Sequence, residues 1–282
     1  MTVEEDNKPS RGDYEEKWAH VKRKHLIIST KDYIVVIDED ENIDWETSPE
    51  YDEIFPSDKE IQAKILNDAA LLETFPCTGI DNKKILHYKR LIGEGIARSL
   101  GGQYDGARAM LEAADKYIKL RSEEISRLWY LSYCLKYVFI IDIFAVMIWL
   151  IRDFINDTFG NGFALLFVAC AFGATGALLS VIGRSGNLHF DCAAGEKLHE
   201  LEAFSRILAG LISGCIVSLA VKSEMIFAPF AKHESFNLII LIAAFAGGTG
   251  ERLVGSIISK FEEPAQKTTQ VKTHPNKAEE IT

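Results

Sequence analysis

The stretch GNGFALLFVACAFGATGALLSVIG, residues 160–183, decides the fold of this chain because it carries no ionisable side chain. At about 1.5 Å per residue, a helix of this length crosses the roughly 30 Å hydrocarbon layer of a bilayer. Ala169, Gly173 and Ala177 recur at a spacing of four, so one helix face lets another backbone approach closely. A buried helix of a soluble protein rarely stays uncharged over such a length. The stretch therefore predicts a membrane-crossing helix that packs tightly against its neighbours.

The composition changes sharply along the 282 residues, whose formal net charge is −10. The opening MTVEEDNKPSR is acidic and polar and lacks the apolar core of a secretory signal, so we expect the first half to stay in the cytoplasm. The predicted domains are a disordered segment (1–24), a mostly helical cytoplasmic domain (25–130), a membrane domain (131–258) and a disordered cytoplasmic tail (259–282).

Three more apolar segments, 131–151, 207–221 and 236–258, accompany the stretch 160–183. Gly210 and Gly214 form a second small-residue stripe, and Gly247 lies in the last segment. The segment 207–221 is short for a straight crossing, which leaves a re-entrant pair with the fourth segment as the alternative to two full crossings. We favour a four-helix transmembrane bundle that forms homo-oligomers through these stripes.

Basic residues are distributed unevenly between the loops. One side carries most of them, namely Lys116, Lys119, Arg121, Arg127, Arg184, Lys197, Arg206, Lys260 and Lys267. The other side carries Arg152, Lys222 and Lys232. Because lysine and arginine are enriched in cytoplasmic loops, both termini are predicted to lie in the cytoplasm.

The first half of the chain shows two local patterns. LIIST and YIVVID, between residues 26 and 38, are β-branched runs that predict a small β-hairpin. Further on, apolar residues with helical spacing (Ile61, Ile65, Ala69 and Leu72) predict one face of a helix. The mainly α-helical fold thus includes a small hairpin at its start.

The stretch 87–121, HYKRLIGEGIARSLGGQYDGARAMLEAADKYIKLR, has the residue spacing of one tetratricopeptide unit. Gly95, Tyr104, Ala107 and Leu111 stand at positions that let two antiparallel helices pack closely. An ordinary helical hairpin is the alternative, and either would offer a surface for a partner protein. We expect the second helix to continue into the first membrane helix.

Ionisable residues at membrane depth need a partner or a water-filled path. The candidates are Asp142, Glu251 and Arg252, with Arg184 at the cytoplasmic end of the second membrane helix. They could line a pore, form a latch that holds it shut, or make a structural ion pair that sets helix register. The pairing of Glu251 with Arg184 is the first to test.

Signals of enzyme chemistry are absent from the sequence. His189, Asp191, Cys192 and His199 fit no strong zinc spacing, and no P-loop or nucleophile elbow is present. The acidic first half opposes direct, sequence-specific nucleic-acid binding. The chain is therefore predicted to be neither an enzyme nor a holder of a metal or cofactor.

The layout of a helical module fused to a glycine-rich membrane bundle resembles the transmembrane effectors of bacterial retrons. The residues that carry the resemblance are GEGIARSLGGQYDGARAMLEAADKYIKL, GATGALLSVIGRSGNLHFDCAAGEKLHELEAFSRILAG and AAFAGGTGERLVGSI. The resemblance implies an inner-membrane effector of antiviral defence. It would be held silent by a reverse transcriptase with its non-coding RNA and single-stranded DNA, and its release would damage the membrane and cause abortive infection.

Two other functions fit the same pattern. The chain could be a membrane-anchored scaffold whose helical domain recruits a client protein. It could also be a small channel or transporter, although no internal repeat between helix pairs supports a substrate site at mid-membrane.

Overall fold

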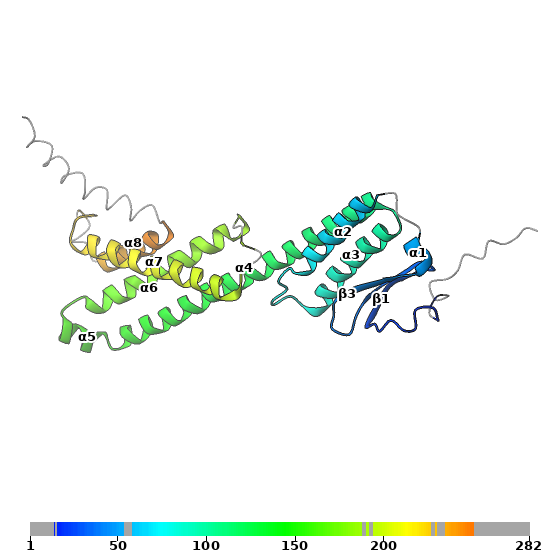
Figure 1. Ribbon diagram of the computed structural model, residues 1–282. Coiled ribbons are helices and arrows are strands. Elements are labelled where there is room, and N and C mark those ends of the chain that lie inside the picture. The colour runs from blue at the N-terminus through cyan, green and yellow to red at the C-terminus, as the bar shows by residue number, and fades with distance from the viewer. Residues whose placement is uncertain are drawn as a thin grey trace, which may run out of the picture. The chain divides into compact units, whose positions relative to one another are not determined.

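The computed structural model describes residues 14, 16–53, 58–187, 190–191, 194–226, 229 and 235–250 (Figure 1). It is mainly helical with one small sheet. The chain divides into two compact units. The N-terminal unit comprises Met1–Ser126 and Phe190–Ala194, and the bundle unit comprises Arg127–His189 and Gly195–Thr282.

The sheet has three antiparallel strands in the order β1 (His25–Ser29), β2 (Tyr33–Ile37) and β3 (Ile43–Thr47). The prediction of a two-stranded hairpin was therefore incomplete. Strand β3 pairs in register with β2, with Val35 opposite Trp45 and Ile37 opposite Ile43. It escaped prediction because three of its five side chains are exposed and acidic residues interrupt its apolar ones.

Both faces of β2 are buried. Val35 and Ile37 face the main core, whereas Ile34 and Val36 pack with Trp18 on the other face. Trp18 is 2% exposed and donates a hydrogen bond from Nε1 to the carbonyl oxygen of Thr30 at 2.8 Å. The predicted disordered segment 1–24 was therefore too long, because Trp18 belongs to the core.

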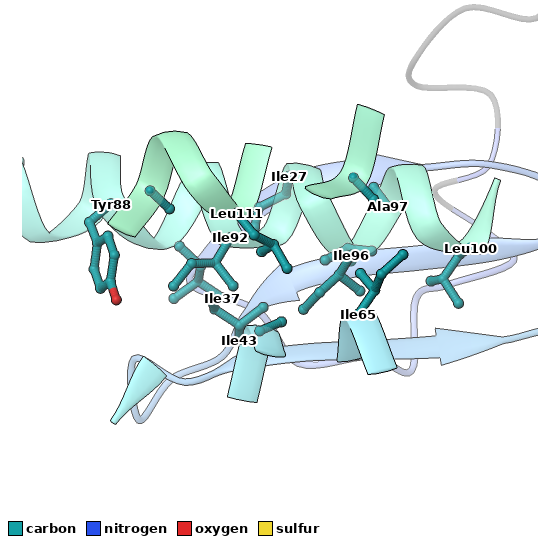
Figure 2. Close-up of a cluster of buried hydrophobic side chains, with 14 of the residues drawn as sticks. Ile27, Ile37, Ile43, Ile65, Tyr88, Ile92, Ile96, Ala97, Leu100 and Leu111 are labelled. Carbon is teal, nitrogen blue, oxygen red and sulfur yellow. The ribbon is translucent and has the colours of Figure 1, made fainter. Parts of the chain in front are cut away.

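Helices α1 (Pro49–Glu53), α2 (Lys59–Glu73) and α3 (Asn82–Leu100) complete the N-terminal unit with the first part of α4 (Tyr104–Leu150). Figure 2 shows Ile65 of α2 and Ile92 and Ile96 of α3 meeting the strand residues in one apolar cluster. The helical spacing predicted for α2 is confirmed, since Ile65 and Ala69 are buried on one face.

The turn between α3 and α4 depends on Gly102, whose φ of +74° lies in the left-handed region. The two helices then approach closely at Gly95. A Cβ atom at this position would lie 2.8 Å from Cδ2 of Leu111. Leu111 is 6% exposed, so the small residue at 95 makes room for a core side chain.

Helix α4 is a single helix of 47 residues and contributes to both units. It is followed by α5 (Arg152–Phe159). The helix forms there because no glycine or proline interrupts the segment before Gly160, whose φ is +103°.

The rest of the bundle unit consists of α6 (Phe163–Arg184), a short 3₁₀ turn η1 (Ser185–Asn187), α7 (Glu196–Lys222) and α8 (Phe236–Thr249). Helices α4, α6 and α7 are long and apolar enough to cross a membrane, which indicates a membrane protein. Helix α7 begins well before residue 207. Although the segment 207–221 is short by itself, the 27-residue helix that contains it is long enough to cross a membrane. Residues 251–258 of the fourth predicted segment lie outside the described residues.

Candidate functional site in the bundle unit

Helices α6 and α7 cross where glycines face each other. A Cβ atom at Gly173 would lie 2.5 Å from the carbonyl oxygen of Gly210 and 2.6 Å from Cα of Gly214. A Cβ atom at Gly210 would likewise collide with the methyl group of Ala177. The structure thus brings these four predicted packing residues together at one crossing, where main chains touch without intervening side chains.

Helix α8 joins the same crossing. A Cβ atom at Gly248 would overlap the carbonyl group of Gly173, and one at Gly176 would overlap the carbonyl group of Phe245. The predicted packing residue Gly247 faces Val217, whose Cγ2 would lie 2.8 Å from an added Cβ. Gly248 was missed as a packing residue, although the Gly247–Gly248 pair was a visible signal.

The part of α4 in the bundle unit is much less covered than the other helices. Its buried side chains, Tyr130, Cys134, Val138 and Ala145, form a stripe at helical spacing. Its other faces expose large apolar side chains, namely Leu135, Phe139, Ile140, Ile143, Phe144, Val146, Met147, Trp149 and Leu150. Such a surface suits contact with lipid or with another apolar helix.

Asp142 lies on the border of the buried stripe of α4 and is partly buried. Its Oδ1 is 3.3 Å from Oγ1 of Thr175 on α6. The same Thr175 hydroxyl is 3.0 Å from the carbonyl oxygen of Ala171. Among the described residues, Asp142 has no ion-pair partner, so its carboxyl group is an ionisable group on an apolar helix without a countercharge from this part of the chain.

A cavity of about 370 Å³ opens beside this carboxyl group. Its walls come from three helices, and the polar groups among its lining side chains are the Asp142 carboxyl, the Thr175 hydroxyl and the Trp149 indole N–H. The lining residues are Asp142, Ala145, Val146 and Trp149 of α4, Val168, Ala171, Phe172 and Thr175 of α6, and Leu241 of α8. The arrangement is that of a small-molecule site: an apolar pocket with a few convergent polar groups.

Of the other predicted pore or latch residues, Arg184 is the one that the described part of the chain includes, and it does not bind Asp142. Arg184 is exposed, and its guanidinium donates hydrogen bonds to the Ser180 hydroxyl at 2.6 Å and to the Ser180 carbonyl oxygen at 3.2 Å. Glu251 and Arg252 lie outside the described residues, so the predicted pairing of Glu251 with Arg184 stays a prediction.

Two tyrosines of α4 are bound to two glutamates of α7, and we call these four residues the tyrosine–glutamate clasp. Tyr133 donates a hydrogen bond to Oε1 of Glu196 at 2.8 Å, and Tyr137 donates one to Oε1 of Glu200 at 3.0 Å. The Tyr137 ring also packs edge-on against Phe204. The clasp was missed, although tyrosines and glutamates at matching four-residue spacing are visible in the sequence.

His199 lies next to the clasp and is 1% exposed. Its Nδ1 is 3.0 Å from Oε2 of Glu202, and its ring faces Trp129 at a centroid distance of 6.4 Å. Asp191 is exposed, while His189 and Cys192 lie outside the described residues. In the described part of the chain, no group of three or more His, Cys, Asp or Glu residues is placed to hold a metal ion.

The residues predicted to form a partner-binding hairpin lie inside the N-terminal unit. Gly95, Ala107 and Leu111 are buried, and Tyr104 is partly buried against the same core. They hold α3 and α4 together, so a partner that binds the folded hairpin would touch other side chains.

Comparison of the chain with protein-family models, curated proteins and solved structures finds no match.

Proposed function

We propose that this protein is a non-enzymatic membrane effector whose N-terminal unit lies in the cytoplasm and controls a bundle in the bacterial inner membrane. A partner complex holds the bundle closed, and release from it lets the bundle permeabilise the membrane. The resemblance of the layout to retron effectors supplies the class of partner, a reverse transcriptase with its RNA and single-stranded DNA. The outcome is abortive infection, an antiviral defence.

The observation that carries this proposal is that one helix contributes to the cores of both units. Ala107, Leu111, Ala114 and Ile118 of α4 are buried in the N-terminal unit, and Tyr130, Cys134, Val138 and Ala145 are buried in the bundle unit. A partner can shift the bundle between states only by binding those states unequally. Since α4 is common to both cores, it offers a direct structural link between partner binding and the bundle.

The arrangement in the membrane follows from the same proposal. Helices α4, α6 and α7 make three crossings, and the predicted apolar segment 236–258, which begins with α8, makes a fourth, which places both termini in the cytoplasm. The exposed apolar faces of α4 contact lipid in the closed state and further copies of the chain in the open one. Asp142 then supplies a polar group to the path that opens.

Expression of the chain in a bacterium with and without its partner tests the proposal. The chain alone should collapse the membrane potential, measured with a potential-sensitive dye, and co-expression of the partner should prevent this. Asp142→Asn should slow the collapse, and Asp157→Asn on the exposed face of α5 is the matched control. A scaffold would leave the potential unchanged, and a transporter would give substrate-dependent flux instead, so either result would overturn the effector proposal.

A further inference from the structure

The cavity beside Asp142 has the composition of a site for a cation with an apolar body. We propose that it binds an organic ammonium ion, with the Asp142 carboxylate as counterion and the apolar walls around the carbon skeleton. The inference rests on the proposed placement of the bundle unit in a membrane. It goes beyond the effector proposal by assigning a small-molecule ligand class to the bundle.

The position of Asp142 makes its charge costly without a ligand. It lies 11 residues after Leu131, the first residue of the predicted crossing, which is about 16 Å along a helix and close to the bilayer middle. Carboxylates at this depth are rare, and they pair with a cation or mark a binding path. The lining of the cavity contains no lysine, arginine or histidine.

The neighbouring hydroxyl satisfies at most one of the two carboxylate oxygens, because its 3.3 Å contact is to Oδ1 of Asp142. The Thr175 hydroxyl has one hydrogen to donate, and its distance to the Ala171 carbonyl oxygen, 3.0 Å, is shorter than the 3.3 Å to Asp142. Whichever of the two oxygens receives this hydrogen, Oδ2 of Asp142 stays available to a ligand. An ammonium group can then donate to Asp142 and to the lone pairs of the Thr175 oxygen.

The walls select an organic cation over a metal ion. The three side-chain oxygens of Asp142 and Thr175 are too few for Ca²⁺, which takes about six to eight, while Mg²⁺ keeps a shell of waters that an apolar wall cannot support. Trp149 and Phe172 supply aromatic rings, which attract ammonium groups within about 6 Å of a ring centre. A volume of about 370 Å³ accommodates a ring and a short chain.

Three probes that share a phenyl body and differ in charge test this inference: benzylamine, benzyl alcohol and phenylacetate. Their binding to the full chain in lipid nanodiscs is measured by saturation-transfer NMR at neutral pH. Benzylamine should bind most tightly and phenylacetate should not bind. Asp142→Asn should weaken benzylamine binding by about tenfold or more while leaving benzyl alcohol unchanged, because only the ammonium gains from the charge.

Asp157→Asn removes the same charge from an exposed position in the same unit and should leave all three affinities unchanged. The inference would be overturned if benzylamine and benzyl alcohol bound equally and Asp142→Asn altered neither affinity, because the cavity would then be an apolar pocket filled by lipid. It would also be overturned if benzylamine did not bind. Circular dichroism of each variant checks that the helices are intact. The dye measurement in cells is separate, so amine binding without depolarisation would refute the effector proposal alone, and depolarisation without amine binding would refute the ligand site alone.

Discussion

Tyr133 of α4 donates its hydroxyl hydrogen to Glu196 of α7 across a distance of 2.8 Å, and one helical turn further on Tyr137 repeats the contact with Glu200. Both helices therefore run in the same direction through this contact. The hydrogen bonds add a polar attachment to the apolar contacts that bury Cys134 and Val138 in the same stretch of α4.

Loss of the clasp should loosen α4. Tyr133→Phe and Tyr137→Phe remove one hydrogen bond each while keeping the rings, so each should lower the unfolding temperature. Thermal unfolding of the detergent-solubilised chain measures the effect. In a double-mutant cycle, Glu196→Gln should couple to Tyr133→Phe and not to Tyr137→Phe. Equal coupling to both tyrosines would contradict the pairing.

The glycine crossing should tolerate no side chain. Gly173→Ala places a methyl group against the main chain of Gly210 and Gly214, neither of which can move as a side chain would. The variant should lose about 1–3 kcal/mol of stability, measured as a lower unfolding temperature. Gly183→Ala on the same helix is the control, since nothing lies within 4 Å of its added methyl group. It should be neutral or stabilising, and equal losses in the two variants would exclude the close crossing.

Two leucines of α4 give a matched pair in the N-terminal unit. Leu111 is 6% exposed and packs in the core, whereas Leu120 is 56% exposed. Leu111→Ala should cost about 2–5 kcal/mol through the lost contacts and the cavity left behind. Leu120→Ala should stay within about 0.5 kcal/mol. Amide hydrogen exchange of α3 reports the difference, and indistinguishable exchange in the two variants would count against this packing.

Tyr88 should make the N-terminal unit sensitive to alkaline pH. Burial raises the pKa of its hydroxyl well above the ordinary value, with further contributions from Cys77, Asp115 and Glu73. Below about pH 10 the hydroxyl is protonated in both the folded and the unfolded state, so its contribution to stability is fully present there. As the pH rises further, the unfolded state ionises first, and stability falls.

Tyr88→Phe removes this titration. The variant loses the hydrogen bond to the Leu72 carbonyl oxygen at every pH but should lose less additional stability than the parent chain above about pH 10. Unfolding temperatures at pH 8 and at alkaline pH give the comparison. Parallel loss of stability in both chains would rule out Tyr88 as the source.

Local spacing was enough to predict much of this structure. The period of Ile65 and Ala69 identifies α2, and the small-residue stripes contain Gly173, Gly210 and Gly214, which meet in the bundle. Residues whose role depends on the rotation of a third helix, such as Gly248, were out of reach because no local pattern encodes that rotation.

Contacts between distant segments were equally hidden. Tyr133 and Glu196 are 63 residues apart, and each is an ordinary surface residue in its own segment. Strand β3 was missed because its apolar residues alternate with exposed acidic ones, which also suits a polar loop. The cavity beside Asp142 forms only when α4, α6 and α8 are packed together. The sequence therefore identified the Asp142 carboxyl group but not the residues that line the cavity around it.

Where Gly173 meets Gly210, Gly214 and Gly248, the main chains of α6, α7 and α8 touch directly, so no side chain at these four positions can change its rotamer. These three helices should therefore move together as one rigid body. A gating displacement would then be a movement of α4, because side chains hold this helix to the other three. The hydrogen bonds of its two clasp tyrosines can break and form again.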